Sequence, residues 1–301
     1  MAAVYSSPLI SNGYQLSNEA NRLGRLTPSD WSRPHRELWE QFRSQGYLWL
    51  KKFFARQDVL ALRGRYFNFM HESGLLAAGR DPVDGIYSGQ PDGTGLTRKL
   101  MAEFVREAAF ESFCLSPRLW QFYEKFLQGP VYLHKRKIIR HTIPYDPSCT
   151  GAHYDLTYLR AGTDRVCTSW IPLGDIPVAM GGLVYLEGSD AMGRKLEAEF
   201  AAKNAHLPPA ERISAYNKNM SATGWLTKNL PQLADRFNTR WLIADYEAGD
   251  IMIHSAYMIH AATVNTNSNG CMRLSTDIRY QRLRDEIDAR WQNHWSFEDT
   301  L

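Results

Sequence analysis

His153 and Asp155 stand two positions apart in the segment His153-Tyr154-Asp155. Residues at positions i and i+2 of a regular strand point to the same face, so both side chains can bind one metal ion. Two imidazoles and one carboxylate on one side of a metal leave the opposite side open. That arrangement suits Fe(II), which must bind an organic molecule and dioxygen together. The pattern therefore predicts a metal site that needs a second histidine from a distant strand.

Two histidines near the end of the segment 249–260 are candidates for this distal ligand. His254 lies within an apolar, strand-like run, where it can equally be a core histidine whose hydrogen bonds are satisfied. His260 follows the same run and precedes Ala261 and Ala262. Local physical chemistry favours neither histidine, and at this point the choice stays open.

Arg273 and Ser275 follow the second histidine by a short interval. Arg273 is flanked by the apolar residues Met272 and Leu274, so on a strand its guanidinium faces away from them. A guanidinium can bind a carboxylate through two parallel hydrogen bonds. We therefore expect Arg273, with the Ser275 hydroxyl, to hold an organic acid that also chelates the metal. The alternative is an ordinary surface arginine.

Three further residues are candidates for lining this pocket. Arg140 and Thr142 lie on the run before His153 and could contact the same carboxylate. Trp170 lies after His153, where it can wall the pocket against water or simply fill the core. We count all three as candidate co-substrate-binding residues.

Composition and charge exclude several classes of protein. The chain has 301 residues, of which 44% are hydrophobic and 22% charged, with a net charge of +3. These values are typical of a soluble globular protein, and the charge is too small to argue for a nucleic-acid partner. The apolar runs are too short to span a membrane. We expect a cytoplasmic protein with a small-molecule substrate, without a membrane or nucleic-acid partner. The sequence also allows a homodimer.

The spacing of apolar residues predicts helices first and strands later. Residues 1–30 are expected to form an arm, and residues 31–290 a single domain that begins with helices. After Gly129-Pro130, short strand-like runs without intervening helices indicate a β-sandwich or barrel. Residues 192–240 interrupt this series of strand-like runs, and the segment is predicted to be a helical insertion or lid. Residues 291–301 are expected to form a C-terminal tail.

Four motifs, in this order along the chain, carry a resemblance to a known family. They are His153-Tyr154-Asp155, Trp170-Ile171-Pro172-Leu173 with the segment 181–189, the segment 249–260, and Arg273-Leu274-Ser275. With the segment 45–54, the chain resembles the phytanoyl-CoA dioxygenase (PhyH) family of Fe(II)/2-oxoglutarate-dependent oxygenases over about residues 35–282. It departs at Glu187 and Asp190, where the family usually has proline and histidine. Neither departure removes a metal ligand.

The resemblance implies a mainly β fold with flanking helices, the double-stranded β-helix or cupin-like jelly roll. It implies His260 as the distal ligand, so that His153, Asp155 and His260 are the catalytic residues that hold Fe(II). It further implies that 2-oxoglutarate chelates the iron, pairs with Arg273 and Ser275, and reacts with dioxygen to give succinate and CO2 while the substrate is oxidised. Asp155 also opposes halogenation, because related halogenases have a small residue there.

The substrate is the least determined feature of the sequence. We expect a small secondary metabolite that is hydroxylated, desaturated or rearranged. The alternatives are an acyl-CoA substrate and a non-catalytic cupin-like protein that binds a metal or small ligand. Coenzyme A would need a basic groove for its phosphates, and only the run His134–Lys137 hints at one. We otherwise expect this run to be a solvent-exposed strand edge. Tyr154, Tyr216 and Trp225 are candidate substrate contacts. The last two lie in the insertion, which is either a lid that closes over the substrate or a helical decoration on the outer sheet.

Overall fold

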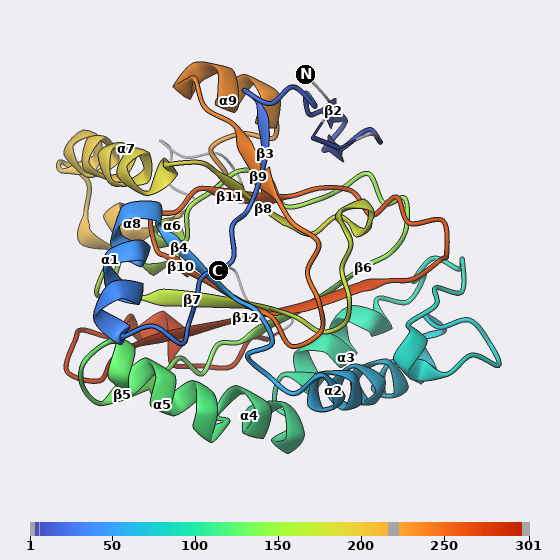
Figure 1. Ribbon diagram of the computed structural model, residues 1–301. Coiled ribbons are helices and arrows are strands. Elements are labelled where there is room, and N and C mark those ends of the chain that lie inside the picture. The colour runs from blue at the N-terminus through green and yellow to red at the C-terminus, as the bar shows by residue number, and fades with distance from the viewer. Residues whose placement is uncertain (1–3, 6, 216–222, 297–301) are drawn as a thin grey trace.

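The computed structural model describes residues 4–5, 7–215 and 223–296 of the chain. Two sheets face each other, as Figure 1 shows. The larger sheet has the order β4 (Tyr47–Leu50), β10 (Ile251–Ser255), β7 (Cys167–Pro172), β12 (Arg273–Arg282) and β5 (Val131–Leu133), and β6 (Ile138–Thr142) also pairs with β12. The smaller sheet has the order β11 (His260–Ala262), β8 (Leu183–Leu186), β9 (Trp241–Ile243) and β3 (Leu23–Arg25). The predicted double-stranded β-helix with flanking helices is confirmed.

Five helices cover the outer face of the larger sheet. They are α1 (His35–Gln45), α2 (Arg56–Phe69), α3 (Leu96–Phe104), α4 (Ala108–Cys114) and α5 (Pro117–Phe126). Their buried aromatic residues, such as Phe67, Phe104 and Tyr123, share one hydrophobic cluster with Ile171 of β7 and Ile278 of β12. Burial of this apolar surface holds the larger sheet as a fixed platform.

Successive side chains of β12 point alternately toward the helices and toward the space between the two sheets. Leu274, Ile278 and Tyr280 belong to the core under the helices. The intervening residues point the other way, and they are Arg273, Ser275, Asp277 and Arg279, all of which line a cavity between the sheets. A strand that is apolar on one face and charged on the other, yet buried, places its charged groups where a ligand can bind them.

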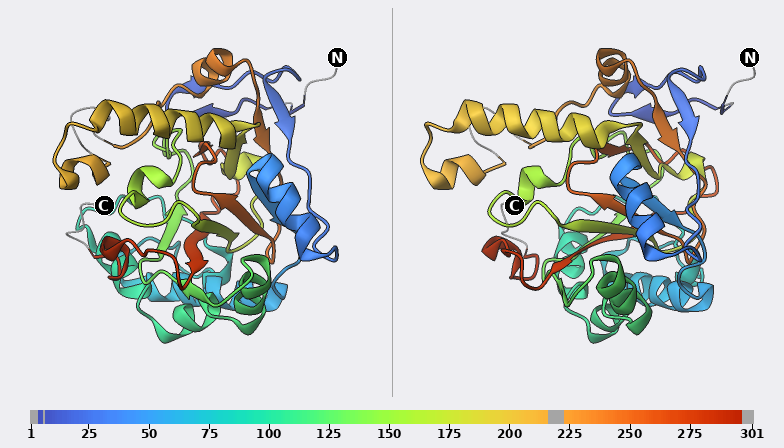
Figure 2. Two further views of the ribbon diagram at one scale, coloured as in Figure 1. Left: turned by 90° about the vertical axis from the view of Figure 1, so that its left-hand side faces the viewer. Right: turned by 60° about the vertical axis from the view of Figure 1, so that its left-hand side comes forward.

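The segments predicted as arm and insertion each contribute ordered elements, whereas in the described part of the predicted tail only Trp291 belongs to one. The first 30 residues hold β1 (Ile10–Ser11), β2 (Tyr14–Gln15) and β3, which pairs in parallel with β9. The region after β8 holds α7 (Ser189–Asn204), α8 (Pro209–Ile213) and α9 (Leu230–Phe237). Figure 2 shows α7 on the side of the sheets opposite to α2–α5. The remaining elements are α6 (Leu156–Leu159) and the 3-10 turns η1 (His71–Ser73), η2 (Pro82–Asp84), η3 (Val178–Met180) and η4 (Ala289–Trp291).

The basic run His134–Lys137 differs from the expectation of a solvent-exposed strand edge. His134, Arg136 and Lys137 are buried, and only Lys135 of the run is exposed. Lys137 pairs with Glu111 of α4, which satisfies its charge. Within the described ranges, no helix has the length and apolar character needed to cross a membrane.

Candidate metal centre

A backbone bridge brings together two histidines that are far apart in the sequence. His153 and His260 form an isolated antiparallel pair, in which each amide donates to the carbonyl of the other at 3.1 and 2.9 Å. The two imidazole ring centroids are 4.2 Å apart. His260 opens β11, whose pairing with β8 fixes its position in the smaller sheet. The tertiary fold therefore supplies the distal histidine that the motif around His153 requires.

The donor atoms of the two histidines converge on one carboxylate oxygen. Nε2 of His153 is 3.7 Å, and Nε2 of His260 3.8 Å, from Oδ1 of Asp155. Each Nδ1 lies 2.9 Å from a backbone carbonyl oxygen, that of Gly151 for His153 and that of Met258 for His260. Because an N–H at Nδ1 donates to these carbonyls, each Nε2 keeps its lone pair for a metal ion. Ligand atoms of the three residues all lie within 4.8 Å of one another.

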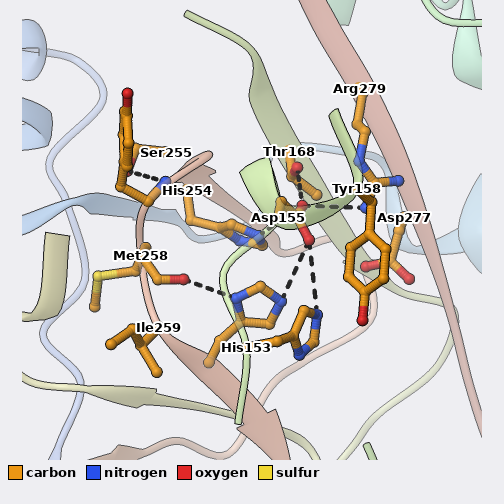
Figure 3. A network of polar contacts seen from close by, with 12 residues as sticks. His153, Asp155, Tyr158, Thr168, His254, Ser255, Met258, Ile259, Asp277 and Arg279 are labelled. Carbon is orange, nitrogen blue, oxygen red and sulfur yellow. Dashed lines mark hydrogen bonds and ion pairs between the residues drawn. The ribbon is translucent and has the colours of Figure 1, made fainter. Parts of the chain in front are cut away.

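Asp155 uses its second oxygen to fix its orientation, as Figure 3 shows. Oδ2 accepts hydrogen bonds from the Thr168 hydroxyl and, at 3.1 Å, from Nη2 of Arg279. Burial by itself would raise the pKa of Asp155, but the charge of Arg279 holds it well below its usual range. Asp155 is therefore ionised, with Oδ1 left for a metal ion.

Burial keeps both histidines in the neutral form that binds metals. It lowers the pKa of His153, and it lowers the pKa of His260 well below its usual value with help from His153 and His254. Neutral imidazole and ionised carboxylate are the states that a divalent cation needs. A two-histidine, one-carboxylate set with an open side suits Fe(II).

His254 lies behind the carboxylate and does not join the donor group. Its Nδ1 is 2.8 Å from the Tyr185 hydroxyl. Its Nε2 is 3.6 Å from Oδ2 of Asp155, the oxygen that faces away from the other two histidines. Of the two candidates that the sequence left open, the structure thus places His260 at the centre and His254 beside it.

A cavity next to the metal donors carries hydrogen-bonding groups whose partners are missing from the described chain. Arg273, Ser275, Trp170 and Arg140 line it together with all three metal-binding candidates. Nη1 of Arg273 donates to the Gly181 carbonyl, whereas its Nε and the Ser275 hydroxyl are buried without a hydrogen-bond partner among the described residues. Burial, with Arg140 nearby, lowers the pKa of Arg273 to about 10, so the guanidinium stays charged at neutral pH. Such groups fit the carboxylate of 2-oxoglutarate.

Of the other predicted site residues that the structure describes, one lines a cavity and two do not. Thr142 pairs with Arg273 across neighbouring strands but does not line the cavity. Tyr154 is buried, and its hydroxyl donates to Glu197 of α7 at 2.7 Å, so it points away from the metal donors. Trp225 lines a second cavity. Tyr216 lies outside the described residues.

The second cavity, of about 380 Å³, opens on the same metal donors. Arg140, His153 and Asp155 line both cavities. The second is bordered in addition by Arg136, Ile138, Tyr158, Thr223, Trp225 and Trp291. The centre thus has a smaller compartment on the Arg273 side and a larger one on the Trp225 side.

Sequence reasoning missed Thr168 and Arg279, which hold Asp155. Both carried a detectable signal. Arg279 continues the alternation that begins at Arg273, and Thr168 precedes Trp170 by two positions on β7, so it shares its face. Neither signal identifies Asp155 as the partner, because β7, β12 and the loop that holds Asp155 meet only in the folded chain.

Comparisons with known proteins agree with this geometry. A family model described as "Phytanoyl-CoA dioxygenase (PhyH)" matches residues 42–274. The 1-deoxypentalenic acid 11-beta-hydroxylase of Streptomyces exfoliatus is 26% identical over 266 residues, which cover 82% of this chain and 81% of that relative. The enzyme of the same name from Streptomyces arenae is 26% identical over 192 residues, covering 60% of this chain and 61% of the relative.

Solved structures share the fold at lower sequence identity. EctD from S. alaskensis with bound Fe is 16% identical, with a TM-score of 0.55 and coverage of 93% of this chain and 89% of that one. The epimerase SnoN in complex with Fe3+, alpha ketoglutarate and nogalamycin RO is also 16% identical, with a TM-score of 0.54 and coverage of 84% and 85%. At these identities the structures support the architecture of the two sheets.

Proposed function

The chain belongs to the phytanoyl-CoA dioxygenase family and is an iron- and 2-oxoglutarate-dependent oxygenase, and on this premise we propose that it hydroxylates a small secondary metabolite. The observation that carries the proposal is the combination of two sets of groups at one centre. His153, Asp155 and His260 form a metal-donor set with an open side. Arg273 and Ser275 present unmatched donors in the adjoining cavity.

We assign each residue of this centre a role. His153, Asp155 and His260 would hold Fe(II), and Thr168 and Arg279 would keep Asp155 on a single coordinating oxygen. The far carboxylate of 2-oxoglutarate would pair with Arg273 and Ser275. When bound, the metal and co-substrate supply the oxidising power from dioxygen, with release of succinate and CO2. The buried walls exclude water and orient the substrate.

The larger cavity supports a small organic substrate over an acyl-CoA. Its volume of about 380 Å³ lies in the range of roughly 300–1,000 Å³ that is usual for small-molecule sites. Coenzyme A would need an open basic groove for its phosphates, and the run 134–137, the one segment that suggested such a groove, is mostly buried. A relative named for the hydroxylation of 1-deoxypentalenic acid also supports a secondary metabolite. Asp155 keeps the carboxylate that halogenases lack, which opposes halogenation, and the name of the same relative favours hydroxylation.

Anaerobic titration of the purified protein with Fe(II) and 2-oxoglutarate tests this function. We expect a weak visible charge-transfer band from the chelate, and succinate formation when air is admitted. Binding of iron without the band and without succinate would instead support the non-catalytic, cupin-like protein. The matched control is Arg273→Ala, which should bind iron but form the band at much higher 2-oxoglutarate concentration.

Three further assignments belong to the same proposal. We infer that the region 192–240 acts as a lid, because Thr223 and Trp225 line the larger cavity. We propose a cytoplasmic location, which localisation of a tagged protein would test. We also propose a homodimer, which sedimentation of the purified protein would test.

A further inference from the structure

We propose that the larger cavity selects an organic acid, whose carboxylate binds Arg136 and Arg279 beside Trp291 while its apolar body lies toward the metal centre. This inference rests on the proposed function, since it names the substrate class of the same site. It adds an anion-binding subsite distinct from the one formed by Arg273 and Ser275. The argument uses the stacking of the arginines, the unmatched donors of Arg279 and the apolar walls of the cavity.

Two guanidinium groups lie against one indole ring. The guanidinium carbon of Arg279 is 4.4 Å, and that of Arg136 5.2 Å, from the ring centroid of Trp291. The indole Nε1 donates to the Tyr158 carbonyl at 3.0 Å, which fixes the ring. Both arginines and Trp291 line the larger cavity, although each of the three is almost fully buried. The indole thus holds the two cations close together.

Arg279 has more donors than the described chain satisfies. Its Nη2 donates to Asp155, but its Nε and Nη1 are buried without a hydrogen-bond partner among the described residues. Its side chain is 5% exposed, so water does not solvate these groups well. A buried donor without a partner destabilises a protein by about 1–3 kcal/mol, and more when it is charged. A carboxylate in the cavity would accept from this edge of Arg279.

Charge in the cavity favours an anion even with metal and co-substrate present. Arg136, Arg140 and Arg279 line it, and among the described residues of its lining Asp155 alone is acidic. Asp277 stands near Arg140, with 3.6 Å between its carboxylate and Nε. Fe(II) would bring two positive charges to Asp155, and the 2-oxoglutarate dianion would offset them. The arginines therefore retain attraction for a substrate carboxylate.

The remaining walls fit an apolar molecular body. Ile138, Tyr158 and Trp225 border the cavity together with the arginines and the metal donors His153 and Asp155, and the Tyr158 ring centroid lies 5.8 Å from that of His153. Figure 3 shows Tyr158 and Arg279 on the side of Asp155 where Thr168 also lies. An acid held by Arg136 and Arg279 would thus present carbon–hydrogen bonds of its apolar body to the open side of the centre.

Matched pairs of acids and amides test the proposal by binding alone. The protein is loaded with Ni(II), which does not support turnover, and with 2-oxoglutarate. Ligand-observed NMR then compares 1-naphthaleneacetate with 1-naphthaleneacetamide, and adamantane-1-carboxylate with its amide. We expect each acid to bind at least about tenfold more tightly than its amide, a difference of about 1.4 kcal/mol. Arg136→Gln should remove this preference, and Arg136→Lys should keep part of it.

Arg56→Gln is the matched control, because Arg56 is exposed and pairs with Asp175 outside the cavity. It should leave the preference for acids unchanged. The melting temperature of each variant shows whether it folds. If Arg136→Gln does not fold, the partial loss expected in Arg136→Lys still tests the proposal. Equal binding of acids and amides would overturn the proposal, as would the absence of binding in both pairs or a preference that survives in Arg136→Gln.

The proposed function has its own readout, so the two failures are distinguishable. The iron-loaded wild-type protein is assayed for slow conversion of 2-oxoglutarate to succinate without substrate. Succinate formation without a preference for acids would contradict the proposed anion subsite and support the proposed oxygenase function. A preference for acids without succinate formation would contradict the proposed oxygenase function and support the anion subsite.

Discussion

Arg279 donates to Oδ2 of Asp155 at 3.1 Å, on the opposite side of the carboxylate from Nε2 of His153 and His260. The Thr168 hydroxyl donates to the same oxygen. One oxygen of Asp155 is thus committed to the protein and the other faces the metal site. This division favours a single metal–carboxylate bond and leaves coordination positions open for the co-substrate and dioxygen.

His153→Ala and His260→Ala should each abolish iron-dependent turnover while the fold remains intact, because each removes a ligand that no other described residue replaces. His254→Ala should keep iron binding, since His254 lies behind Asp155. Iron content after gel filtration and circular dichroism of each variant check this. Loss of iron in His254→Ala but not in His260→Ala would reverse the assignment of the distal ligand.

Arg273→Ala should raise the KM for 2-oxoglutarate strongly. A buried charge-assisted pair is worth roughly 2–4 kcal/mol, which corresponds to about 30-fold or more. Arg273→Lys should recover part of the affinity, since an ammonium cannot make two parallel bonds. Ser275→Ala should have a smaller effect, about 1 kcal/mol. Steady-state kinetics at varied 2-oxoglutarate measure all three. An unchanged KM in Arg273→Ala would direct attention to Arg140, which lines the same cavity.

Thr168→Val should weaken metal binding about 10- to 100-fold without removing a ligand, because outer hydrogen bonds orient the carboxylate. Thr168→Ser retains the hydroxyl and is the matched control. Titration with Co(II), followed by its visible spectrum, measures the affinity directly. Equal Co(II) affinity in Thr168→Val and wild type would show that Arg279 alone orients Asp155.

Acid should destabilise the apoprotein partly through His134. Burial lowers the pKa of this histidine to about 4, and its Nε2 lies 2.8 Å from the Gln281 carboxamide oxygen. In the unfolded chain its pKa is about 6.5, so the unfolded state takes up the proton first. Its contribution to stability is complete above about pH 6.5 and is lost as the pH falls toward 4, by up to about 1.4 kcal/mol per pH unit.

Urea unfolding at pH 7, 6 and 5 measures this effect of His134. The slope of stability against pH should be smaller in His134→Gln than in the wild type. Replacement of the exposed His71 by Gln is the control. Parallel slopes for His134→Gln and wild type would assign the acid sensitivity to other groups.

Trp225→Ala should uncouple turnover if the region 192–240 closes over the substrate. The indole lines the larger cavity and packs on Gly151, two residues before the metal ligand His153. Without it, 2-oxoglutarate would still be consumed but less product would form per succinate. A lower melting temperature with an unchanged product-to-succinate ratio, in this variant and in Tyr216→Ala, would instead make the segment a structural decoration.

The sequence by itself determined the family, the architecture and the chemistry. Its ordered motifs predicted the phytanoyl-CoA dioxygenase family, the double-stranded β-helix, and the use of iron and 2-oxoglutarate, and these predictions are confirmed. The spacing also placed His153 and Asp155 at one site, and their side chains do lie together. The strand geometry behind that prediction is wrong, because Asp155 adopts a helical backbone conformation at the start of α6. The rule that residues two apart on a strand share a face also placed Arg273 and Ser275 together.

The tertiary structure decided which distant residues meet. His254 and His260 both point into the space between the sheets, but the bridge between His153 and His260 brings one of them to the donor set. Thr168 and Arg279 reach Asp155 because β7 and β12 are neighbours. The run 134–137 is buried except at Lys135, although its charges suggested exposure. Local sequence fixes the face that a side chain occupies. Pairing between strands far apart in the chain fixes what that face meets, and no local pattern encodes it.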